Sequence, residues 1–171
     1  AQLQFKDDGP NINVSEATVP TLIVDESFLG ANDSASFAGN FSGVYGADNA
    51  GTTTYALNVS SAGAMSGLVD TATNANVLLY LESGQVVGRA GSAAGAIVFT
   101  LSVDGSGIVT LDQQRAIVHP TLDPDESKGL SGSGLINLVG TITNKDGDTK
   151  SASLDLSLIH ISEPTRHLRI G

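Results

Sequence analysis

The chain has 171 residues, a length that fits one domain, and it contains no cysteine, which excludes a disulfide framework. The 18 acidic and 8 basic residues give a formal net charge of −10, so nucleic acid and anionic membrane surfaces are poor partners and divalent cations are better ones. No apolar run approaches the roughly 18 residues of a membrane-spanning helix, and we expect a monomeric module without membrane insertion.

Short runs of alternating or continuous apolar residues, separated by Gly, Pro, Asn and Asp, predict β-strands along the chain. In the first part, strands are predicted at residues 2–6, 21–24, 34–45 and 53–60. The run at 34–45 is interrupted by Gly39 and Gly43 and fits either one bent strand or two. The run at 53–60 places Tyr55, Leu57 and Val59 on one face.

Three hairpins are predicted next, each from two apolar runs with a Gly-containing turn between them. The first joins residues 77–81 to 85–89 through Ser83-Gly84. The second joins residues 97–103 to 108–111 through a turn at 104–107. The third joins residues 135–143 to 151–156 through a turn at 144–148.

About nine strands without a convincing amphipathic helix predict an all-β fold, an immunoglobulin-like β-sandwich, with a closed β-barrel as the alternative. The expected core consists of the apolar residues that alternate on the inward faces of these strands. They are Tyr55, Leu57, Val77, Leu79, Phe99, Leu101, Val109, Leu111, Leu138, Ile142 and Leu154.

Several motifs occur in an order that resembles a known repeat family. They are FKDDGP (5–10), VDES (24–27), GADNAGTTTYALNV (46–59), GLVDTATNANVLLYLESGQVVGR (67–89), IVFTLSVDGSGIVTLDQQRAIVHPTLDPDES (97–127) and TITNKDGDTKSASLDLS (141–157). The chain resembles the tandem extender repeats of giant repeats-in-toxin (RTX) adhesins exported by type I secretion. The resemblance implies one module over residues 1–157, located outside the cell or on the bacterial outer surface, that contacts neighbouring repeats and supports cell adhesion and biofilm formation.

Residues 158–171 differ from the module in character. Residues 157–171 carry one acid and two bases, whereas residues 1–156 carry 17 acids and 6 bases. The segment resembles translated sequencing-adapter sequence, and the alternative is a natural final strand at 158–161 followed by a disordered end. From the sequence alone we assign no function to this tail.

Three groups of side-chain oxygens lie at predicted turns, where they can bind Ca²⁺, a cation that takes about 6–8 oxygen ligands. They are Asn144, Asp146 and Asp148 in the last hairpin turn, Asp7 and Asp8 near the start, and Asp123, Asp125 and Glu126 between the second and third hairpins. The simpler interpretations are a plain hairpin turn, a solvated linker and a feature that favours solubility. The family usually has Asp at the position of Asn144, which implies a weaker ligand here.

Catalytic motifs are absent from the sequence. It has no GxSxG nucleophile elbow, no P-loop and no HExxH. We expect His119, the histidine outside the tail, to be a packed or capping residue. The expected function is therefore a structural extender that calcium stiffens. A module that binds a glycan or peptide ligand is the alternative, and a polysaccharide-acting enzyme is the least favoured class.

Overall fold

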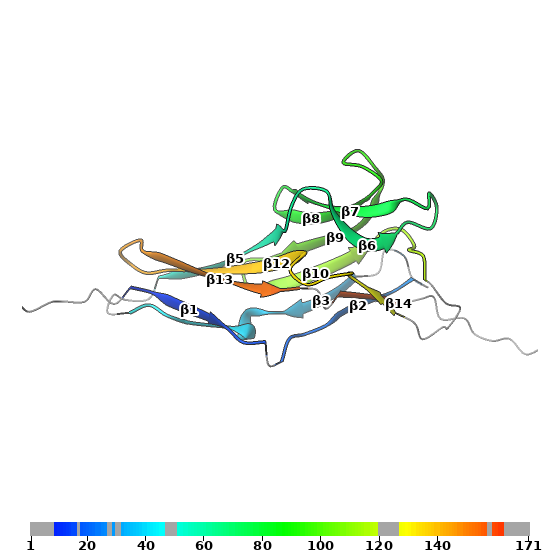
Figure 1. Ribbon diagram of the computed structural model, residues 1–171. Coiled ribbons are helices and arrows are strands. Elements are labelled where there is room, and N and C mark those ends of the chain that lie inside the picture. Colours follow the sequence, from blue (N-terminus) through cyan, green and yellow to red (C-terminus); the bar gives the residue numbers. More distant parts are fainter. Residues whose placement is uncertain are drawn as a thin grey trace, which may run out of the picture.

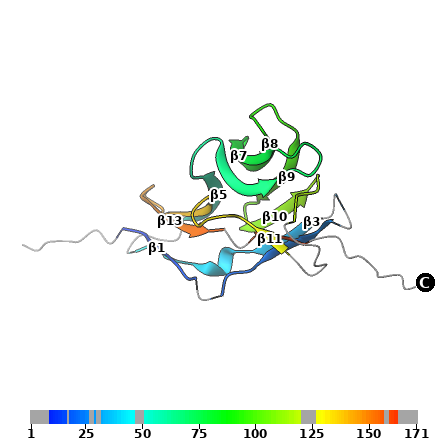
Figure 2. The same cartoon turned by 45° about the vertical axis from the view of Figure 1, so that its right-hand side comes forward.

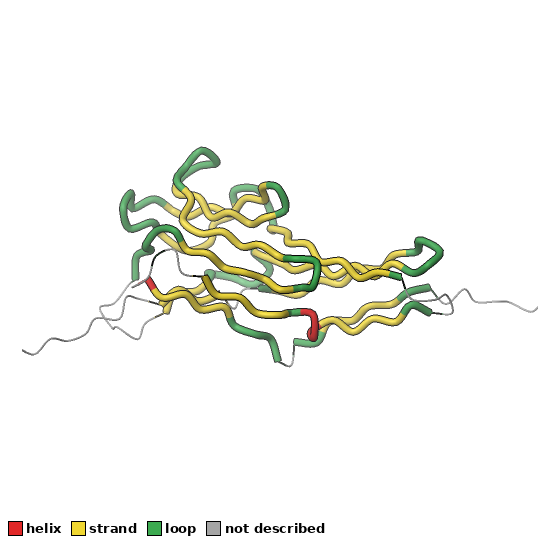
Figure 3. The backbone as a smooth tube through the Cα atoms, turned by 180° about the vertical axis from the view of Figure 1, so that it is seen from behind, coloured by secondary structure: helices red, strands yellow, loops and turns green. Residues whose placement is uncertain are grey.

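The computed structural model describes residues 9–16, 18–26, 29, 32–46, 51–119, 127–156 and 159–162. Their fold is an elongated all-β sandwich with two layers (Figures 1 and 3). None of the sheets closes into a barrel within these residues. The predicted all-β sandwich is confirmed, and no helix among the described residues is long and apolar enough to cross a membrane.

Fourteen strands and one short 3-10 helix, η2 (Ala38–Asn40), make up the described chain. The strands are β1 (Asn11–Val14), β2 (Leu22–Asp25), β3 (Asn32–Ser36), β4 (Phe41–Val44), β5 (Thr52–Val59), β6 (Ala64–Val69), β7 (Asn76–Glu82), β8 (Gln85–Ala90), β9 (Ile97–Val103), β10 (Ile108–Gln113), β11 (Ser127–Gly129), β12 (Ile136–Thr143), β13 (Thr149–Asp155) and β14 (Ile159–Ser162). The prediction of about nine strands was too low, because several short strands lack a clear alternation of apolar residues.

Four sheets form the two layers. One layer holds a six-stranded sheet in the order β3-β10-β9-β8-β7-β6 and a three-stranded sheet in the order β13-β12-β5. The pair β1-β4 and the sheet β11-β14-β2 lie on the opposite side (Figures 1 and 2). All strand pairs are antiparallel except β14 with β2.

The three predicted hairpins are confirmed as β7–β8, β9–β10 and β12–β13. In the first, Ser83 and Gly84 both have positive φ, at 51° and 80°. A two-residue turn of this type matches the twist of the strands that it joins. Local turn chemistry therefore sets the register of β7 against β8, in which Glu82 lies opposite Gln85.

The run at 34–45 forms two strands, with η2 between them. The side-chain nitrogen Nδ2 of Asn40, a buried residue, donates to the backbone oxygens of Ser15 (2.9 Å) and Thr18 (3.0 Å). These bonds hold the turn against the segment after β1. The chain consequently leaves the six-stranded sheet at β3 and pairs with β1 through β4.

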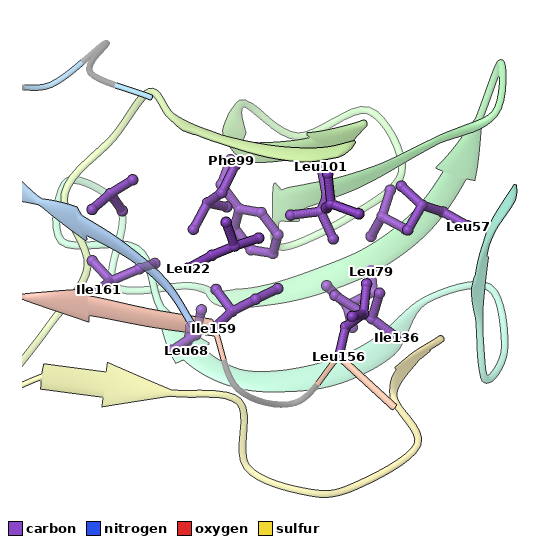
Figure 4. Packing of buried hydrophobic residues seen from close by; sticks show 14 of the residues in the cluster. Leu22, Leu57, Leu68, Leu79, Phe99, Leu101, Ile136, Leu156, Ile159 and Ile161 are labelled. Atoms are coloured by element: carbon purple, nitrogen blue, oxygen red, sulfur yellow. The ribbon is translucent and has the colours of Figure 1, made fainter. Parts of the chain in front are cut away.

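The core lies between the layers (Figure 4). The predicted core residues are buried, apart from Tyr55, which is half-buried with its ring 5.6 Å from that of Phe41 in an edge-to-face contact. Phe99 is 1% exposed, and a Cβ atom at Gly88 would collide with its ring. Glycine at position 88 thus makes room for the largest side chain at the centre of the six-stranded sheet.

Candidate functional site

The turn at 144–148 is held by hydrogen bonds among its own residues. The side-chain oxygen of Asn144 accepts the backbone N–H groups of Asp146 and Asp148, both at 3.0 Å. The backbone N–H of Asn144 also donates to the carbonyl oxygen of Asp148 at 2.9 Å, and Gly147 has a φ of 89°. Asn144 is buried, whereas Asp146 and Asp148 are exposed. This geometry is that of a hairpin turn whose Asn stabilises the backbone.

The other calcium candidates, Asp7, Asp8, Asp123, Asp125 and Glu126, lie outside the described residues. Within the described ranges, no group of three or more His, Asp or Glu side chains is arranged to hold a metal ion. Calcium binding therefore stays a prediction. Among the described candidates, Asp146 and Asp148 are the remaining ligands, because the side-chain oxygen of Asn144 already accepts two backbone N–H groups of the turn.

A different set of polar side chains is brought together by the fold. We name Glu26, Asp70, Gln113, Arg115 and His119 the buried polar cluster. Glu26 follows β2 and Asp70 follows β6, whereas Gln113 ends β10 and the other two lie in the segment after it. Charged side chains are seldom buried unless they are paired or hydrogen-bonded, so the partners of each carboxylate define what the cluster does.

Glu26 holds the segment that follows β10. One of its carboxylate oxygens, Oε1, accepts the backbone N–H of Ile117 at 2.7 Å and the side-chain amide of Gln113 at 2.9 Å. The imidazole Nε2 of His119 lies 3.4 Å from the same oxygen. The side chain of His119 is 3% exposed, which confirms it as a packed residue, and neither ring nitrogen has a hydrogen-bond partner among the described residues.

Asp70 holds the same segment from the other side. Its carboxylate, which is fully buried, accepts hydrogen bonds from Arg115 Nε (3.0 Å) and Nη2 (2.9 Å). It also accepts the backbone N–H (3.1 Å) and hydroxyl (2.6 Å) of Thr73. The hydrogen bonds from Arg115 hold the pKa of Asp70 below its ordinary value, against the opposing effect of burial.

The two carboxylates thus fix residues 113–119 between β2 and the end of β6. A backbone bridge joins Asp70 to Ile117 in the same place. Beside it lies an open pocket of about 270 Å³, lined by Leu29, Asp70, Thr71, Ala72, Gln114, Arg115 and Ala116. Since both acids already serve as acceptors for the fold, the cluster acts as a structural clasp that connects distant parts of the chain.

Sequence reasoning missed the clasp because its members are far apart. Arg115 and Asp70 are separated by 45 residues, and Ile117 and Glu26 by 91. Glu26 also stands next to Asp25, directly after the apolar run at 21–24, and nothing in that local pattern indicates a buried carboxylate. The available signal was a charged residue at the end of a short apolar run, as for Asp70 after Gly-Leu-Val.

Comparison with known protein families gives a match over most of the chain. Residues 21–157, from just before β2 to just after β13, match the family DUF5801, a domain of unknown function. β1 and β14 lie outside the matched range. No curated protein and no solved structure matches the chain. The chain belongs to the DUF5801 family.

Proposed function

We propose that this chain is a structural extender module of a large secreted bacterial surface adhesin, in which it spaces a terminal binding domain away from the cell. The observation that supports the proposal best is the course of the chain. β1 begins near one end of the long axis of the sandwich, and β14 lies toward the other end (Figures 1 and 3). Copies joined head to tail would therefore form an extended array.

The composition and the clasp agree with this role. A cysteine-free module cannot be cross-linked wrongly during export, and a large net negative charge keeps neighbouring arrays apart in solution. The buried polar cluster ties the segment after β10 to two other parts of the chain. An extender needs such long-range connections, since force along the array would otherwise peel off single strands.

The extender role predicts how length grows with copy number. We expect tandem chains of two and four copies to show a maximum dimension in small-angle X-ray scattering that increases by a constant amount per module. The matched control is a set of unlinked modules measured at low protein concentration, which should keep the dimension of one module. A compact four-copy particle would contradict the proposal. Tight binding of one copy to a glycan array would favour the ligand-binding alternative.

We also propose that calcium stiffens the module. Clustered carboxylates repel one another, and a bound divalent ion reverses the sign of that interaction. Extracellular calcium modules bind at roughly 10⁻⁴–10⁻³ M, and a ligand at about 100 times its dissociation constant adds about 2.7 kcal/mol to the free energy of unfolding. We therefore expect the melting temperature in millimolar Ca²⁺ to exceed that in EGTA by several degrees.

Variants locate this calcium effect. Asp146→Ala with Asp148→Ala should remove most of the difference between the two melts, whereas Glu16→Ala, which removes an exposed acid elsewhere, should leave it unchanged. A two-copy chain tests a site shared between neighbours at Asp7 and Asp8. Equal melting temperatures in Ca²⁺ and EGTA for both the single and the two-copy chain would show that calcium has no stiffening role.

A further inference from the structure

β14 occupies the centre of its sheet. It pairs in parallel with β2, so that Ile159 lies opposite Leu22 and His160 opposite Ile23. On its other side it pairs antiparallel with β11, with Gly129 opposite His160. Among the described strands, β2 and β11 are therefore joined only through β14. Removing this strand would leave a slot with two strand edges, each of which presents unpaired backbone groups.

The slot selects its strand by a simple pattern. Ile159 and Ile161 point inward and are 3% and 1% exposed, beside core residues such as Leu22 (Figure 4). Between them, His160 is half-buried next to Ile23, which is 51% exposed on the outer side. Any extended segment with apolar residues two positions apart could fill the slot. Its two apolar side chains would enter the core, and its backbone would form hydrogen bonds with β2 and β11.

Two further observations concern the connection of β14 to the module. The family match ends at residue 157, so the strand that fills the slot is not part of the matched domain. Only residues 156–158 join it to β13, which lies in a different sheet. Exchange of such an element between identical copies is a low-cost route to dimers, because the same contacts form in the partner.

We propose that the slot between β2 and β11 is a strand-acceptor site, and that a second copy of this chain can fill it with its own β14. The exchanged strand makes in the partner the contacts that it makes within its own module. The exchange couples two modules through main-chain hydrogen bonds and two buried isoleucines. The proposal does not depend on the extender function, since any protein with this slot would show the exchange.

Cysteine trapping tests the exchange in the full chain, which has no cysteine of its own. Ile23 and His160 are register partners in parallel strands, and neighbouring strands lie about 4.8 Å apart, within reach of a disulfide. Chains carrying only Ile23→Cys are unfolded and refolded together with chains carrying only His160→Cys, then oxidised. Strand exchange predicts a disulfide-linked heterodimer whose yield rises with protein concentration.

The double variant Ile23→Cys with His160→Cys should form the bond within one chain at low concentration.

The matched control uses a pair inside a hairpin. Thr141 and Ser151 are register partners on β12 and β13, with hydroxyl oxygens 2.7 Å apart, and a hairpin has no free strand to donate. The exchange predicts a several-fold higher heterodimer yield for the 23/160 mixture than for the 141/151 mixture. Equal yields would overturn it.

A second measurement needs no substitution. Isotopically light and heavy wild-type chains are refolded together at high concentration, and native mass spectrometry should then detect mixed dimers. Monomers alone in that experiment would also overturn the proposal.

Discussion

Replacing Phe99 with alanine is expected to lower the free energy of unfolding by about 3–5 kcal/mol. The ring is 1% exposed at the centre of the six-stranded sheet, and it lies over Gly88 on the neighbouring strand. Alanine would leave a cavity, because two β-strands with fixed register cannot close around the missing ring. The loss combines the transfer free energy of the ring with the cost of the cavity.

Denaturant unfolding followed by circular dichroism measures this loss. Leu81→Ala is the matched control, since Leu81 lies on β7 of the same sheet but is 45% exposed. We expect the control to change the free energy of unfolding by no more than about 0.5 kcal/mol. Equal effects of the two substitutions would show that Phe99 does not fill the centre of the core.

Asp70→Asn is expected to lower the free energy of unfolding at neutral pH by about 1.5–3 kcal/mol, the contribution of hydrogen bonds to charged groups. The asparagine keeps the shape of the side chain but loses the charge that pairs with Arg115. Its amide group also presents a donor where the carboxylate accepted N–H groups from Arg115 and Thr73. The clasp on residues 113–119 would therefore weaken from one of its two sides.

Asp70→Asn should also change how the free energy of unfolding depends on pH in acid. The pKa of Asp70 is lowered in the folded state, chiefly by the hydrogen bonds from Arg115, while the unfolded value is about 3.9. The ionised carboxylate thus contributes its full stabilisation above the unfolded pKa and loses it as the pH falls through the lowered folded pKa. Asp70→Asn should therefore flatten the stability curve in acid, below the unfolded pKa of about 3.9.

Glu82→Gln is the matched control for the clasp. Glu82 forms the corresponding two-point pair with Arg89, at 2.7 and 2.8 Å, and its pKa is also lowered by that arginine. The Glu82 side chain is 39% exposed, so water screens the pair and its loss should change stability much less. If both variants lost the same stability, burial of Asp70 would not be the source of the clasp's strength.

The sequence alone determined the fold class and the hairpins. β7–β8, β9–β10 and β12–β13 each combine apolar alternation with a turn that Gly, Asn or Asp favours, and both signals act within a few residues. The core residues followed from the same alternation. The Asn144–Asp148 turn was located correctly, but its sequence could not show whether the Asn144 oxygen faces a cation or its own backbone.

Tertiary structure decided the features that depend on residues far apart in the chain. β6 was not predicted, because Ser66 and Gly67 interrupt its apolar residues, yet the buried Ser66 hydroxyl donates to the carbonyl oxygen of Val77 at 2.7 Å and is satisfied there. β14 is a strand because β2 and β11 pair with it from both sides. The clasp of Glu26 and Asp70 likewise forms only after the sheets have packed, since burial and long-range pairing depend on the whole fold and not on local pattern.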